Sequence, residues 1–161
     1  MPKIELETVI EAPIERVFDL ARSIDLHKLS TKGTDERAID GKTSGLIELG
    51  ETVTWKAKHF GIYQKLKVQI TEFDNPHMFC DVMLKGAFRK MRHIHKFRQE
   101  GKHTRMIDEF VFESPLGLLG KIVDSFFLKR YMKNFLIEKN KELKFFAEND
   151  KWKEIITMYN E

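Results

Sequence analysis

The stretch KMRHIHKFR, residues 90–98, alternates between two kinds of side chain. In a β-strand, successive side chains leave opposite faces of the sheet, so alternate residues share a face. One face would carry four cations, Lys90, Arg92, Lys96 and Arg98. The other face would carry Met91, His93, His95 and Phe97. Because four cations without partners cannot face a core, we expect their row to face water and the histidine row to face the interior.

The segment TRMIDEFVFE at residues 104–113 adds a carboxylate to this interior. Asp108 shares a face with Phe110, whereas Arg105 and Glu109 lie on the other face. We therefore expect Asp108 to point inward with the histidines, where a buried carboxylate needs hydrogen-bond partners.

The segment MFCDVML at residues 78–84 is apolar on both faces, so its pattern leaves the register open. If Phe79 and Met83 point inward, Asp81 points inward with them. A second carboxylate would then join the buried group. Such polar side chains must be satisfied by one another, by water or by a ligand.

The same alternation on either side predicts an antiparallel meander. ETVTWKAK (residues 51–58) and IYQKLKVQITEF (residues 62–73) form a hairpin about Gly61, with Trp55 on the inner face. The links between the later strands are short, which indicates antiparallel pairing rather than a parallel sheet. A half-buried strand at residues 3–11 brings the expected total to about seven strands.

Helical spacing predicts two short helices after the first strand and one long helix near the C-terminus. The short helices are expected from Pro13 to Ala21 and around Asp25 to Leu29. Ser114-Pro115 supplies an N-cap and a first-turn proline for the long helix, which should run to about Asn149. Residues 30–50 read as a polar loop with one short strand near residues 36–39.

The chain divides into a domain at residues 1–149 and a short helical extension at residues 150–161. The extension repeats apolar side chains at helical spacing: Trp152, Ile155, Ile156 and Tyr159. Because so short a helix cannot bury this face alone, we expect it to dock on the same domain or on a second copy, and we favour the same domain. The protein would accordingly be a monomer or a homodimer.

Composition and charge exclude several classes of function. The chain has 161 residues, of which 42 % are hydrophobic and 33 % charged, and its net charge of +3 is too small to argue for nucleic acid. Cys80 is the only cysteine, and the acidic N-terminus lacks the apolar run of a signal peptide. No stretch of 18 apolar residues is present, so we expect a cytoplasmic protein without stable membrane insertion.

A strongly curved sheet wrapped on one long helix cannot fill its own concavity, so we expect a cavity with apolar walls and a few polar groups. The expected lining is Trp55, Phe79, Asp81, Met83, Met91, His93, His95, Phe97, Asp108, Phe110, Ile122, Phe126, Phe127 and Tyr131. Gly117 and Gly120 weaken the first turns of the long helix. Together with the loop at residues 30–50 they are our candidates for the gate of this cavity.

The order of strand, two short helices, six-strand meander and long helix resembles the helix-grip fold of the START/Bet v 1 (SRPBCC) superfamily. The local match is to bacterial ligand-binding SRPBCC and polyketide cyclase-like proteins. It is carried by the stretches GKTSGLIELGETVTWKAKHFG, ITEFDNPHMFCD, GAFRKMRHIHKF and TRMIDEFVFESPLGLLG. Gly86-Ala87-Phe88 departs from the Gly-Pro-Phe that this family often has at the same place.

This resemblance implies an α+β fold in which a curved antiparallel sheet of about seven strands wraps on a long C-terminal helix. It also implies a deep hydrophobic cavity for lipids, polyketides or other apolar metabolites. It does not fix a reaction, because a fold hosts many functions.

Four readings of the histidine pair remain open. His93 and His95 could bind a metal with Asp108 or Asp81, but no further ligand lies at a diagnostic spacing. They could instead stiffen the sheet by hydrogen bonds to the two aspartates, or line the cavity. Finally, His93 or His95 could act as a general base oriented by Asp108, as in a cyclase, aromatase or dehydratase.

We favour a protein that binds, and so could transport or sequester, a small hydrophobic molecule, and we expect no metal and no organic cofactor. The alternative is a polyketide cyclase-like or dehydratase-like enzyme whose catalytic residues would be His93, His95 and Asp108. No oxyanion hole or nucleophile is marked in the sequence, which is why binding ranks first.

Overall fold

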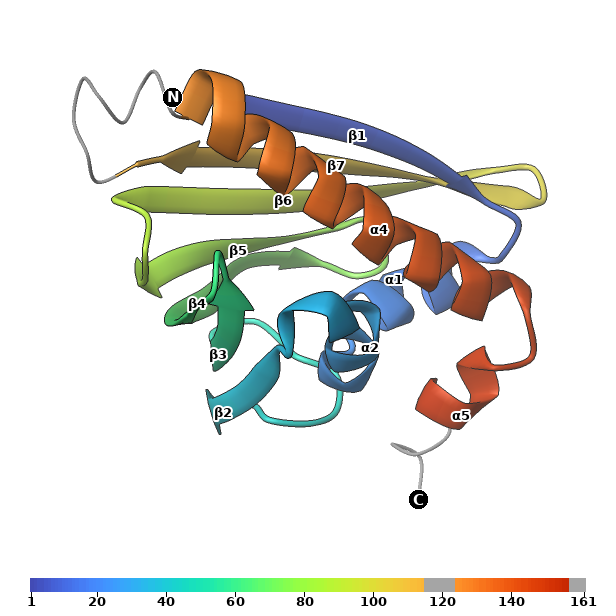
Figure 1. The fold of residues 1–161 in the computed structure, drawn as a ribbon. Helices are drawn as coiled ribbons and strands as arrows, with labels where there is room; N and C mark the ends of the chain where they lie inside the picture. Colours follow the sequence, from blue (N-terminus) through green and yellow to red (C-terminus); the bar gives the residue numbers. More distant parts are fainter. Residues whose placement is uncertain (115–123, 157–161) are drawn as a thin grey trace.

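The computed structural model describes residues 1–114 and 124–156 of the chain. Antiparallel strands form a seven-stranded sheet in the order β1-β7-β6-β5-β4-β3-β2 (Figure 1). Strands β2 to β7 therefore form a meander, and β1 pairs with β7 at the edge of the sheet. The strands are β1 (Lys3–Ile10), β2 (Arg37–Gly41), β3 (Thr52–His59), β4 (Ile62–Asp74), β5 (Met78–Lys85), β6 (Lys90–Glu100) and β7 (His103–Glu113). The predicted meander and the predicted number of strands are confirmed.

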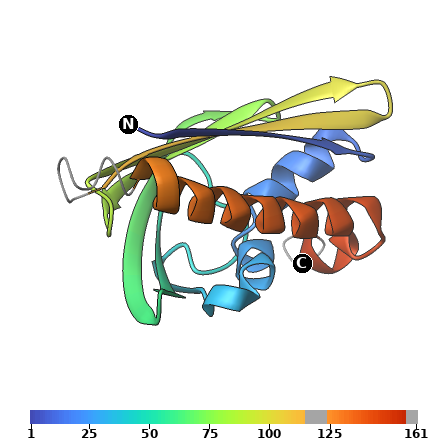
Figure 2. The same cartoon turned by 45° about the horizontal axis from the view of Figure 1, so that its top comes forward.

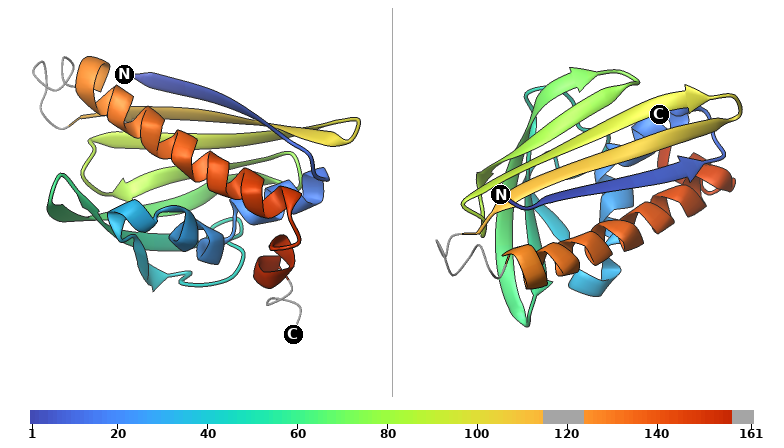
Figure 3. Two further views of the ribbon diagram at one scale, coloured as in Figure 1. Left: turned by 45° about the vertical axis from the view of Figure 1, so that its right-hand side comes forward. Right: turned by 90° about the horizontal axis from the view of Figure 1, so that it is seen from above.

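The helices cover the concave face of the sheet. They are α1 (Ile14–Ala21), α2 (Ile24–Ser30), the 3-10 turn η1 (Lys32–Thr34), the π-helical turn η2 (Asp124–Leu128), α4 (Lys129–Glu148) and α5 (Trp152–Ile156). Helix α4 crosses this face obliquely, and β3 and β4 bend towards its N-terminal end (Figure 2). Seen from above, α4 runs beside β1, and α2 lies on the same side of the sheet (Figure 3, right). This arrangement is the predicted α+β helix-grip fold.

Local sequence signals explain why these elements begin and end where they do. Pro13 precedes α1 and directs the chain from β1 into the helix. Ser23 caps α2, because its hydroxyl accepts a hydrogen bond from the backbone N–H of Leu26 at 3.1 Å. Between β3 and β4, Phe60 and Gly61 both have positive φ, +53° and +75°. This combination makes a tight two-residue hairpin turn whose twist matches the flanking strands.

The two faces of β6 are divided as the alternation predicted. His93 and His95 are only 5 % and 6 % exposed and lie on the concave face. The four cations of the other row are exposed on the convex face. Arg92 pairs there with Glu72, and Lys96 pairs with Glu109. Arg98 pairs with Glu100 of the same strand, so three of the four cations of this row have acidic partners.

Aromatic side chains fill the end of the core beneath α1. The ring of Phe18 makes edge-to-face contacts with Phe73, Phe79 and Phe97, with ring centroids 5.4–5.6 Å apart. Such pairs contribute about 0.5–1.5 kcal/mol beyond the burial of their area. The core at this end is therefore tightly packed, and the space that remains lies towards the N-terminal half of α4.

The C-terminal elements agree only in part with the predicted ones. Helix α4 ends at Glu148, close to the predicted end at Asn149, but the predicted start at Ser114-Pro115 and the residues Gly117, Gly120 and Ile122 cannot be compared. Pro115, Gly117, Gly120 and Ile122 fall within positions 115–123, which lie outside the described residues, as does Tyr159. Within residues 1–114 and 124–156, no helix has the length and apolar composition that crossing a membrane requires.

The extension folds back on its own domain. Helix α5 packs against α1 and α4, and Ile155 belongs to the hydrophobic core. The guanidinium of Arg16 lies 4.3 Å from the centre of the Trp152 ring, which is a cation–π contact. Within the described residues of this face, Ile155 is buried, and Trp152 and Ile156 are partly buried against the core.

Candidate ligand cavity

Two adjoining cavities lie between the sheet and α4. One has a volume of about 110 Å³ and reaches the buried histidines, and we call it the polar cavity. The other has a volume of about 330 Å³ and lies towards the β3–β4 turn, and we call it the apolar cavity. The two share the wall residues Glu36, Trp55, Leu66, Phe88, Met132 and Phe135. The two cavities are therefore separated by no more than these shared side chains.

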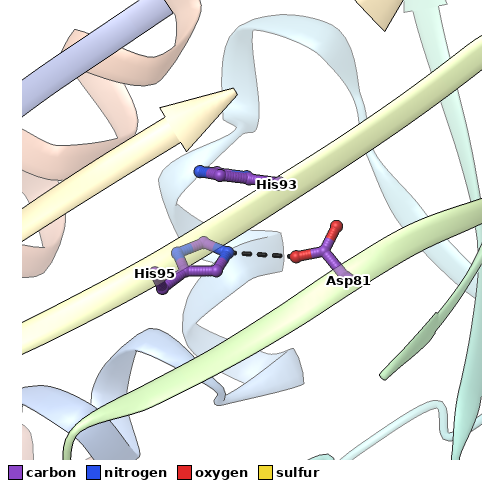
Figure 4. A group of neighbouring side chains, drawn as sticks. All are labelled: Asp81, His93 and His95. Carbon is purple, nitrogen blue, oxygen red and sulfur yellow. Dashed lines mark hydrogen bonds and ion pairs between the residues drawn. The ribbon is translucent and has the colours of Figure 1, made fainter. Parts of the chain in front are cut away.

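Two histidines and two aspartates from three neighbouring strands form a cluster at the polar cavity. The register pairs His93 of β6 with Asp81 of β5, and His95 with Asp108 of β7. The side chains then bond diagonally: His95 Nε2 lies 3.0 Å from Asp81 Oδ2, and His93 Nε2 lies 2.9 Å from Asp108 Oδ1. Figure 4 shows His93 and His95 side by side, with Asp81 facing His95. Their ring centres are 3.8 Å apart.

His95 is the cation of this group. Its Nδ1 lies 3.1 Å from Asp108 Oδ1 while its Nε2 faces Asp81, so each ring nitrogen faces a carboxylate oxygen. An ionised carboxylate only accepts hydrogen bonds, and both ring nitrogens donate only in the imidazolium form. Burial alone would lower the pKa of His95, but the hydrogen bonds to Asp108 and Asp81 raise it above 6.5. This geometry and the raised pKa favour the imidazolium form of His95, with a proton on each ring nitrogen.

His93 has the opposite character. Burial, and next the charge of His95, lower its pKa below 6.5, so His93 is neutral. Its Nε2 donates to Asp108, which leaves Nδ1 as an acceptor, and the residue lines the polar cavity. No described residue donates a hydrogen bond to this Nδ1. The sequence did not distinguish the two histidines, because both occupy the same row of one strand.

Asp108 lies behind the histidines and is only 2 % exposed. Burial would raise its pKa, but hydrogen bonds from His93 and His95 hold this pKa far below its usual range. Asn140 of α4 donates to the second oxygen of Asp108 at 2.7 Å. Sequence reasoning missed Asn140, although a signal exists: it lies in the buried stripe of Leu136, Leu143 and Ala147. Asp108 is therefore a support of the cavity rather than part of its surface.

A second ionisable pair was also missed. His27 of α2 donates from Nε2 to Glu36 Oε1 at 3.0 Å, and its ring stacks on Trp55 with centroids 4.0 Å apart. Burial, and next the charge of Lys139, lower the pKa of His27, so it is neutral. Burial raises the pKa of Glu36, but His27 and Lys139 together lower it by more than burial raises it. The net shift is downward, so Glu36 is ionised. Nothing in the loop at residues 30–50 marked Glu36 as a wall residue.

The predicted lining is brought together only in part. The residues that do line the polar cavity are Trp55, Phe79, Asp81, Met91, His93, His95 and Phe110, while Tyr131 lines the apolar cavity. Met83 packs against the hydrophobic core, and Phe97 is buried in it beneath α1. Neither of these two side chains borders one of the two cavities.

Phe126 and Phe127 were wrongly assigned to the cavity wall. They are 78 % and 57 % exposed. Both belong to η2, whose π-helical turn takes up more residues than an α-helical turn and so changes the direction of the residues before α4. The ring of Phe127 instead lies 5.4 Å from that of Phe60 at the β3–β4 turn. The apolar stripe of the sequence was extended through this turn with the wrong period.

Asp81, His93 and His95 are residue types that commonly bind metal ions. One ligand atom each from Asp81, His93 and His95 lies within 4.8 Å of the others. However, both ring nitrogens of His95 face carboxylates, and a metal ligand must give up its proton. A metal would thus have to displace the His95 proton and break the hydrogen bond to Asp81.

Searches against protein-family models and curated sequences found no match. Solved structures match over most of the chain, among them TTHA0849 from Thermus thermophilus, with a TM-score of 0.72 and 20 % identity over 89 % of this chain and 94 % of that chain. The ginseng major latex-like protein 151 from Panax ginseng follows at 0.69 and 15 %, over 92 % and 98 %. A START superfamily protein from Mycobacterium smegmatis gives 0.70 and 11 %, over 91 % and 97 %.

The chain therefore has the helix-grip fold of the START/Bet v 1-like (SRPBCC) proteins. At these identities the likeness concerns the fold, and the chemistry must be argued from the residues of the cavity itself.

Proposed function

We propose that the protein binds a small, mainly apolar molecule in the space between the sheet and α4. The observation that carries this proposal is the apolar cavity of about 330 Å³, which lies within the usual range for small-molecule sites. Most of its wall surface is apolar, and Glu36 is a polar residue that it shares with the polar cavity. A molecule with an apolar body and one polar end fits this distribution.

Nile red, a neutral dye that fluoresces in apolar surroundings, tests this proposal directly. We expect saturable binding by the native protein and competition by apolar compounds that copurify from the protein's own host and are identified by native mass spectrometry. Ala57→Phe should weaken dye binding, because Ala57 lines the apolar cavity. Thr54→Phe, on the other face of β3, is the matched control. Equal affinity in both variants would contradict the proposal.

General-base catalysis is a second candidate, and the state of His93 favours it. A neutral imidazole with a free Nδ1 at the cavity wall can accept a proton, and Asp108 fixes the ring through Nε2. Such a base would suit a cyclase-like or dehydratase-like reaction. If the copurified compound is converted by the protein, His93→Gln should abolish conversion and leave its binding intact. Unchanged conversion in that variant would exclude His93 as the base.

A further inference from the structure

The second oxygen of Glu36 is a buried acceptor without a donor. The Glu36 side chain is 7 % exposed, and His27 occupies Oε1. Within residues 1–114 and 124–156, Oε2 is buried and has no hydrogen-bond partner. The hydroxyl of Thr31 lies nearby and helps to lower the pKa of Glu36, but it donates its proton to the backbone carbonyl of His27 at 2.8 Å. A buried carboxylate oxygen in this state is costly and calls for a donor.

The position of Glu36 shows where such a donor would come from. Glu36 belongs to the walls of both the polar and the apolar cavity, so it lies where they meet. His27 holds Oε1 and is itself held by stacking on Trp55. The carboxylate is therefore fixed before any ligand arrives, which reduces the entropy that binding loses.

The charges around the polar cavity favour a donor over an anion. Three ionised carboxylates, Glu36, Asp81 and Asp108, face two cations, His95 and Lys139. Arg22 also lines this cavity but pairs with Asp19 at 2.8 Å. An anionic ligand would thus add charge to a group that is already negative. Lys139 is only half-buried and can be solvated, whereas Glu36 Oε2 cannot.

We propose that Glu36 Oε2 receives the polar end of the ligand, so that the site selects apolar molecules that end in a hydrogen-bond donor, a hydroxyl or an amine. The apolar body of the ligand occupies the larger cavity, and its terminal O–H or N–H completes the hydrogen bonding of Glu36. This inference rests on the proposed binding function and narrows it to one class of ligand. Apolar molecules that end in a carboxylate are disfavoured.

Four compounds with the same ten-carbon chain test this inference by displacing Nile red: decanol, decylamine, decyl methyl ether and decanoate. A hydrogen bond to a charged group corresponds to roughly tenfold in affinity or more. We therefore expect the alcohol and the amine to bind about tenfold more tightly than the ether and the carboxylate. Glu36→Gln should remove this preference, because the amide offers a donor of its own. Glu48→Gln, an exposed position in the same loop, should retain it.

The outcomes separate this inference from the proposed function. If Nile red does not bind saturably to the native protein, the proposed binding function is refuted. If the dye binds but none of the four compounds displaces it, the proposed ligand class and with it the role of Glu36 are refuted. If all four displace it equally, or if the preference persists in Glu36→Gln, the role of Glu36 is refuted while the binding function stands. Tightest binding of decanoate, lost in Lys139→Met, would place the polar end of the ligand at Lys139 instead. The preference of the native protein needs no variant, so misfolding of Glu36→Gln cannot obscure it.

Discussion

Asn140 on α4 donates a hydrogen bond to Asp108 on β7 across 2.7 Å, and so joins the long helix to the floor of the cavity. The same carboxylate accepts hydrogen bonds from both histidines of β6. One buried carboxylate thus fixes the position of a helix relative to a sheet and the charge of an imidazole.

Loss of the Asn140 amide should destabilise the fold. Asn140→Leu leaves Asp108 Oδ2 buried without its donor, and a hydrogen bond to a charged group contributes about 1.5–3 kcal/mol. We expect the free energy of unfolding in urea to fall by about 2 kcal/mol. Asn134→Leu, at an exposed position of the same helix, should change it little. Equal effects of the two substitutions would show that the hydrogen bond is energetically unimportant.

The two histidines should titrate in opposite directions from the ordinary value. In NMR titrations of the ring protons, the midpoint of His95 should lie above pH 6.5 and that of His93 below it. The order follows from the carboxylate on each side of His95 and from the burial of His93 next to this cation. Assignment with His93→Gln and His95→Gln distinguishes the signals. Coincident midpoints, or the reverse order, would contradict the charge states assigned here.

These shifts also set the pH dependence of stability. The raised pKa of His95 means that its contribution is present below the unfolded value of 6.5 and is lost as the pH rises through the folded pKa. The lowered pKa of Asp108 means that its contribution is present above the unfolded value of 3.8 and is lost at more acid pH. His95→Gln should therefore cost more stability at about pH 6 than at about pH 9. Urea unfolding at both pH values measures this difference, and an equal cost would refute the linkage.

Zinc should not bind stoichiometrically to Asp81, His93 and His95. Because His95 is protonated between two carboxylates, a metal must first displace a stabilised proton. Elemental analysis of untagged protein should find far less than one zinc per chain, and a chelator should leave the melting temperature unchanged. One equivalent of zinc that is lost in His93→Ala would overturn this prediction.

Removal of α5 should lower stability without changing the association state. Ile155 is buried in the core, and burial of a large side chain contributes about 1.5–3 kcal/mol. Truncation after Asn149 should lower the melting temperature by the same amount at all protein concentrations. Ile155→Ala should reproduce much of this loss, and Glu154→Ala, at an exposed position, should not. A shift from dimer to monomer in sedimentation would show that the extension contacts a second copy.

The sequence predicted the facing of β6 because an alternating row of cations leaves only one orientation. The sequence did not decide on which face of β5 Asp81 lies, because β5 is apolar and buried on both faces. Phe79 and Cys80 are neighbours on opposite faces, and both are buried. Sequence periodicity cannot choose a face when neither face is polar. In the structure, the register between β5 and β6 places Asp81 on the inner face, because Asp81 pairs with the inward-facing His93.

The remaining misses have different physical causes. His27 lies on α2, and Glu36 lies in the link between η1 and β2. The two meet only because of the path of the chain through α2 and η1, and this path has no periodic signal in the sequence. Phe126 and Phe127 were misplaced because a π-helical turn interrupts the α-helical period. Asn140 could have been found, since a polar residue at the spacing of a buried stripe needs a buried partner.

The recessed place of Asp108 separates what can be redesigned in this protein from what cannot. The groups that a bound molecule would touch, such as Trp55, Leu66 and Glu36, are held by their own neighbours and not by Asp108. Their substitution can change the choice of ligand while the carboxylate that joins α4 to the sheet stays intact. Exchange of Asp108 would disturb both histidines and the helix together. Libraries that vary the cavity walls and keep Asp108 and Asn140 should therefore yield folded proteins with new specificities.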